Sequence, residues 1–68
     1  MGRTVSTVEK HGQKIRNKKV GTIGIIKGTD SMGYGGELLY GFKCYVPKEK
    51  QTLFLPFKNL NAWEVVGK

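Results

Sequence analysis

The chain has 68 residues with 38% hydrophobic content, which suffices for one small domain (residues 1–68) and leaves little material for an enclosed active site. A net charge of +7 favours an acidic partner such as nucleic acid. One cysteine and one histidine exclude an internal disulfide and the common zinc sites, and no apolar run is long enough for a membrane helix. We therefore expect no enzyme, no cofactor, no membrane partner and a cytoplasmic location.

The positive charge is concentrated near the start of the chain. Residues 1–29 hold seven basic residues against one acidic residue, whereas residues 30–68 hold five against four. After a first predicted strand over Thr4–Val8, the polar residues 9–19 predict a long basic loop. The cations of this loop are spaced like a track for phosphate groups, and a loop that only aids solubility is the alternative. They are Lys14, Arg16, Lys18 and Lys19.

A second strand is predicted over Val20–Lys27, where β-branched residues alternate with glycines that permit a close backbone approach. The glycine-rich residues 28–36 begin like a phosphate-binding loop but lack its lysine, and a strand pattern follows instead of a helix. We therefore predict a mobile loop between two strands. Its Tyr34, flanked by two glycines, either meets a ligand or folds back over the domain.

The strongest strand pattern covers Leu38–Val46. Alternate residues of this strand are apolar and predict its core face, namely Leu38, Tyr40, Phe42, Cys44 and Val46. Lys43 and Tyr45 lie on the opposite face, where an aromatic ring beside a cation favours stacking of unpaired bases. A Tyr45 that is simply part of the core is the alternative.

The last third of the chain predicts three short elements. Thr52–Leu55 is a fourth strand that Pro56 ends, Phe57–Asn61 is a turn of 3₁₀ helix, and Ala62–Val66 is a fifth strand. Trp63 is predicted to be buried beside Phe57.

Five short strands in so small a chain favour closure into a barrel, because closure removes exposed edges. "GTIGII" (residues 21–26) and "LPFKNLNAWEVV" (residues 55–66) resemble the core motif and closing segment of SH3-like small barrels, including the KOW and Tudor-type modules. The resemblance implies an all-β, five-stranded SH3-like barrel with a 3₁₀ turn before the last strand.

The leading expectation is a non-enzymatic module that binds nucleic acid through phosphate contacts. The alternative is a protein-interaction module, an accessory subunit or inhibitor, that docks on an acidic protein surface; small barrels of this kind serve both roles. The candidate residues for either partner are Lys14, Arg16, Lys18, Lys19, Lys27, Tyr34, Lys43 and Tyr45.

Overall fold

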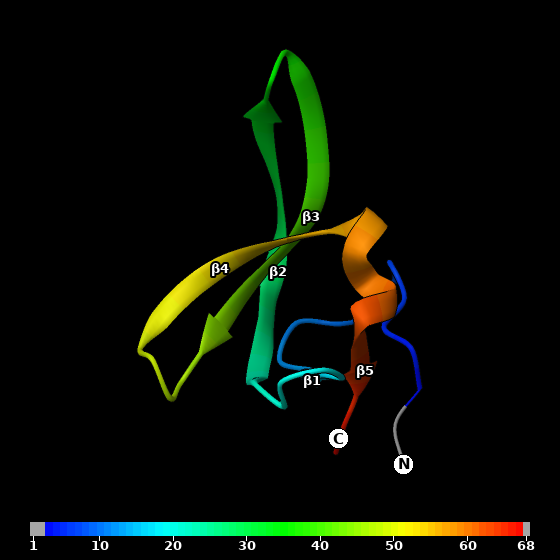
Figure 1. Cartoon of the computed structure of the whole chain (residues 1–68), viewed down its shortest axis with the longest axis vertical. Coiled ribbons are helices and arrows are strands. Elements are labelled where there is room, and N and C mark those ends of the chain that lie inside the picture. Colours follow the sequence, from blue (N-terminus) through cyan, green and yellow to red (C-terminus); the bar gives the residue numbers. More distant parts are fainter. Residues whose placement is uncertain (1–2, 68) are drawn as a thin grey trace.

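The computed structural model describes residues 3–67, apart from the side chain of Tyr34, and contains one five-stranded antiparallel sheet (Figure 1). The strands are β1 (Lys14–Asn17), β2 (Ile23–Tyr34), β3 (Glu37–Val46), β4 (Gln51–Pro56) and β5 (Trp63–Val65), and a 3₁₀ helix, η1 (Phe57–Ala62), precedes β5. The predicted all-β class and the predicted 3₁₀ turn are confirmed.

The sheet has the order β4-β3-β2-β1-β5 and is not closed into a barrel, so the predicted closure is wrong. After β4, η1 carries the chain to the far edge of the sheet, where the three-residue β5 pairs with β1. No pairing between β4 and β5 joins the two edges within residues 3–67. The small antiparallel sheet is compatible with an SH3-like fold.

The elements from β3 onward lie within one residue of their predicted bounds. The earlier part of the chain differs. The predicted basic loop over residues 9–19 contains β1, because the fully buried Ile15 draws that backbone between β2 and β5. The predicted strand over Thr4–Val8 is reduced to a single bridge between Thr4 and Glu64. β2 begins only at residue 23, because the Asn17 carboxamide accepts hydrogen bonds from the next backbone amides and closes a turn.

The prediction of a loop over residues 28–36 is also wrong. β2 continues to Tyr34, and Gly35 and Gly36, with φ of 58° and 85°, make the two-residue turn into β3. Positive φ at both turn residues matches the twist of a tight hairpin, which explains the pair of glycines. Residues 29–40 of this hairpin, called the arm below, project beyond the other strands (Figure 1). The remaining described residues are called the body.

The core lies in the body. Its buried side chains are Val5, Ile15, Ile26, Phe42, Cys44, Leu55, Leu60, Trp63 and Val65, with Phe57 packed against them. The Phe42 and Phe57 rings meet edge to face, with centroids 5.1 Å apart. Gly24 lies so close to Cys44 that a β-carbon at Gly24 would lie 2.3 Å from the Cys44 sulfur. This is the close backbone approach predicted for the glycines of this strand. Leu38 and Tyr40, predicted as core, are instead 57% and 59% exposed on the arm, because β4 reaches only as far as Gly41.

Candidate functional site

The strand register divides the predicted binding residues between two faces of the sheet. Residues that pair directly across antiparallel strands share a face, and neighbours along a strand alternate. Ile26 and Cys44 pair and are fully buried, so they mark the inner face that holds the core. The opposite, outer face therefore carries a row that runs from β1 to β4. The row consists of Lys14, Ile25, Tyr45 and Thr52.

A second row of the outer face holds Lys43 between Gly28 of β2 and Phe54 of β4. The register shifts between Ile26 and Gly28, so Lys27 is the extra residue of a β-bulge. Its Nζ lies 5.7 Å from the centroid of the Tyr45 ring, which places Lys27 on the outer face as well. The attraction between a cation and the negative face of an aromatic ring favours this arrangement.

Arg16 also points to the outer face, but its charge is compensated. Its guanidinium pairs with the Glu64 carboxylate, and Nε donates a hydrogen bond of 2.8 Å to Oε2. Lys18 lies beyond the end of β1, with Nζ 3.4 Å from the Thr4 hydroxyl, and Lys19 is exposed in the turn that follows. The backbone of Tyr34 pairs with Glu37 at the end of the arm, and its side chain lies outside the described part of the structure.

The structure thus brings together Lys14, Lys27, Lys43 and Tyr45, and places the other predicted cations at or beyond the edge of that group. These four residues are called the basic face below. Half-buried apolar side chains surround the lysines, and sequence reasoning did not assign them to a site. They are Ile23, Ile25 and Phe54. The register places Ile23, Ile25 and Phe54 on this face, because they pair with Arg16, Lys14 and Lys43 across neighbouring strands.

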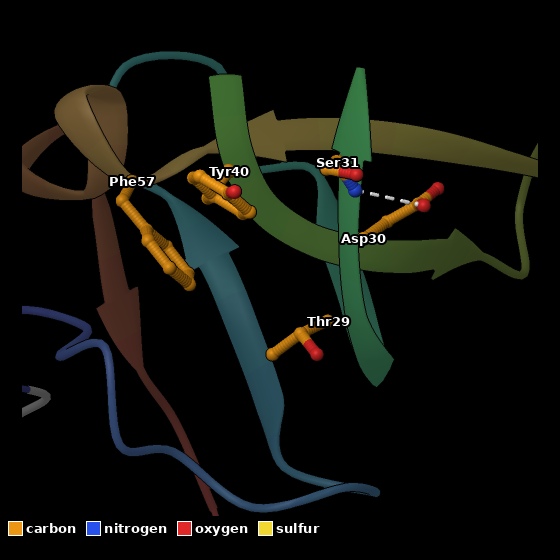
Figure 2. A pocket seen from close by; sticks show the side chains of 5 residues that line it. All are labelled: Thr29, Asp30, Ser31, Tyr40 and Phe57. Carbon is orange, nitrogen blue, oxygen red and sulfur yellow. Dashed lines mark hydrogen bonds between the residues drawn. The ribbon is translucent and has the colours of Figure 1, made fainter. Parts of the chain in front are cut away.

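A hollow of about 480 Å³ lies on the inner side of the arm, between the hairpin and η1 (Figure 2). Thr29, Ser31, Tyr40 and Phe57 line it together with Asp30. Asp30 Oδ1 accepts a hydrogen bond of 2.8 Å from the Ser31 amide, and its side chain points away from the two aromatic rings. The hollow therefore offers hydroxyls and aromatic surface, without a paired acid and base.

Two groups outside the basic face have altered pKa values. Burial raises the pKa of the Cys44 thiol, which suits a packing role and disfavours a thiolate nucleophile. A hydrogen bond from Arg3 lowers the pKa of Glu9, and the pair ties the segment before β1 together. Within residues 3–67, no three metal-binding side chains gather at one place, and the single short helix falls well below the length and apolarity that a membrane span requires.

Comparison of the chain with protein-family models, with curated proteins and with solved structures finds no match.

Proposed function

We propose that the chain is a non-enzymatic module that binds nucleic acid through phosphate contacts on the basic face. The observation that carries the proposal is the register, which gathers Lys14, Lys27 and Lys43 around Tyr45 on one side of the sheet. Lysines that neutralise phosphates release counterions from the nucleic acid, and this release favours binding without regard to base sequence.

The apolar surroundings of these lysines support the same role. Half-buried Ile25 and Tyr45 give the lysine stems a surface to lie on while the ammonium groups stay in water. Lys27 lies over the Tyr45 ring, where a stacked base would have to displace it. We therefore favour phosphate contact over base stacking at Tyr45.

The fold also fits the proposal. A small antiparallel sheet with a 3₁₀ turn before its last strand is compatible with an SH3-like fold, so we propose an open relative of the KOW and Tudor-type modules. A single buried thiol fits a reducing compartment, and the proposed location is cytoplasmic.

The test is fluorescence anisotropy with labelled double- and single-stranded DNA and RNA over a salt series. Replacing Lys14, Lys27 and Lys43 with Gln should remove up to three phosphate contacts. For a duplex, this reduces the slope of log K against log salt by about 2.7, at about 0.9 per contact. The matched control replaces Lys10, Lys48 and Lys50, which are exposed elsewhere and carry the same total charge. Equal losses in both triple variants would leave only a general charge effect and contradict the proposal.

Docking on an acidic protein surface is the second candidate function. The same lysines with apolar neighbours would serve it, and the exposed apolar side chains of the arm favour protein contact. Failure of all four nucleic acids to bind below about 100 μM, the weak end of non-specific affinity, would favour this candidate.

A further inference from the structure

The hollow on the inner side of the arm exposes aromatic surface. Tyr40 is 59% exposed on the two-stranded arm, and Phe57 is half-buried at the start of η1. The edge-to-face contact with Phe42, at a centroid distance of 5.1 Å, fixes the Phe57 ring in place. Both rings line the hollow, and its volume of about 480 Å³ falls within the range typical of small-molecule sites (Figure 2).

The groups around the hollow select an uncharged ligand. Thr29 and Ser31 line it from β2 with hydroxyls that can donate or accept hydrogen bonds. The side chain of Asp30 points away from the aromatic rings (Figure 2), and no lysine or arginine is among the lining residues. An anion such as phosphate therefore finds no cation in the hollow. A flat, neutral ring with polar edges, such as a nucleobase, matches both the aromatic surface and the hydroxyls.

Lysines lie close by, on the other side of the same strand. Within the described part of the chain, β4 pairs with β3 only from residue 41 onward, so residues 37–40 form a free edge. On the outer side of this edge, Lys58 lines a shallow hollow of about 320 Å³ with Phe54, which pairs with Lys43. Phe57 precedes Lys58 and lines the inner hollow, so the two hollows meet at the start of η1. A polynucleotide held by these lysines reaches the inner hollow by crossing the edge of one strand.

We infer that the inner hollow holds an unpaired base of a single-stranded nucleic acid, stacked on Tyr40, while the adjoining phosphates contact Lys43 and Lys58. The inference rests on the proposed function and names the form of nucleic acid that this side of the molecule takes. Stacking on an aromatic ring tolerates any base sequence, because every base has a π-face. Bases that are paired in a duplex are not free to enter the hollow, so Tyr40 should contribute only to the binding of single strands.

Fluorescence anisotropy with two labelled single strands of equal length tests the inference. One strand carries bases and the other is abasic at its internal positions, so both present the same phosphates. Tyr40→Ala should bind the strand with bases roughly 5- to 150-fold more weakly than the wild type does. The same variant should bind the abasic strand as the wild type does, with the same salt dependence. Tyr40→Phe should behave like the wild type, because it keeps the ring.

Leu38→Ala is the matched control. Leu38 lies two residues before Tyr40 on the same strand face and is 57% exposed, so its loss should leave the binding of both strands unchanged. Circular dichroism should show that each variant keeps the sheet, since both positions are exposed. An equal loss of binding in Leu38→Ala and Tyr40→Ala would overturn the inference, and so would wild-type binding of the strand with bases by Tyr40→Ala.

A neutral nucleoside gives a second readout that contains no phosphate. In NMR spectra of the ¹⁵N-labelled chain, adenosine at millimolar concentration should shift the amide signals of Thr29, Ser31 and Tyr40 more than those of the basic face. Shifts confined to other residues, or shifts at these residues with glucose and not with adenosine, would overturn the inference. Salt-dependent binding of the abasic strand would then leave the proposed function standing. If neither strand binds, the proposed function fails and this inference fails with it.

Discussion

β2 and β3 run through both the arm and the body, yet their side chains are fully buried only in the body. In the body, β1 pairs with β2, β4 and η1 contact β3, and Phe42 is 1% exposed. Two residues earlier on the same strand and the same face, Tyr40 is 59% exposed. The difference lies in what covers the strand and not in the strand itself, because a two-stranded ribbon has no second layer to pack on.

The contrast extends to charge. All 12 lysines and arginines of the chain lie outside the arm. In the body, strands are held by side chains that exclude water, whereas the arm depends on backbone hydrogen bonds and on the turn at Gly35 and Gly36. Changes in the arm should therefore have little effect on the stability of the body.

The largest expected difference concerns local opening of the two regions. Body amides, such as that of Phe42, should exchange only through global unfolding, which costs roughly 3–10 kcal/mol for a domain of this size at 0.05–0.15 kcal/mol per residue. Amides of the arm, such as those near Met32, should exchange with little protection. Hydrogen exchange followed by NMR measures both. Arm amides as protected as those of the body would show that the ribbon is held by contacts that the isolated chain lacks.

Truncation of one side chain in each region should show the same contrast in stability. Phe42→Ala removes a fully buried ring that meets Phe57 and should cost about 3–5 kcal/mol. Tyr40→Ala, the control on the same strand face, should stay within about 0.5 kcal/mol. Urea unfolding measures both values. A mild effect at Phe42 would mean that the inner face is not the packed one.

Added β-carbons should distinguish the regions on a smaller scale. A β-carbon at Gly41 would lie 2.2 Å from the backbone oxygen of Leu55, so Gly41→Ala should cost about 1–3 kcal/mol through displacement of β4. At Gly33 of the arm nothing lies within 4 Å, and Gly33→Ala should leave stability unchanged or raise it by up to about 1 kcal/mol. Thermal unfolding of the two variants provides the comparison, and equal effects would contradict it.

The smallest effect concerns Glu9, whose pKa is lowered chiefly by the hydrogen bond from Arg3. A depressed pKa in the folded state contributes stability at neutral pH. This contribution declines once the pH falls below about 4.3, the ordinary glutamate pKa, and is lost below the folded pKa. Glu9→Gln should therefore be slightly less stable than the wild type at pH 7, and the difference should vanish in acid. Melting temperatures from pH 2 to 7 measure it, with Glu37→Gln on the arm as the control. A difference that persists at pH 2 would show that the ion pair is not its source.

The sequence predicts the second half of the fold well, and the reason is visible in its side chains. β3 alternates apolar residues over its whole length, and Pro56 and the 3₁₀ turn define the end of β4. β1 was missed because only Ile15 of its four residues points into the core, so its pattern is that of a polar loop. The arm half of β2 was missed because its residues are small or polar, and pairing across the ribbon, rather than propensity, makes them a strand.

The candidate site was predicted by residue type but not by arrangement. Lys43 and Tyr45 follow from alternation in β3. Lys27 reaches the same face because a bulge adds one residue to β2, and no pattern in the sequence marks that insertion. Arg16 is held by Glu64, which is 48 positions away in the chain, so its compensation depends on a long-range contact.

The position of Cys44 has a practical consequence. It is the only thiol, it is fully buried behind Gly24, and burial raises its pKa. A thiol reagent added to the native protein should therefore react only when the body opens, and its labelling rate should not depend on motion of the arm. The rate at which the reagent labels Cys44 therefore measures global unfolding of the native sequence, and no probe has to be engineered.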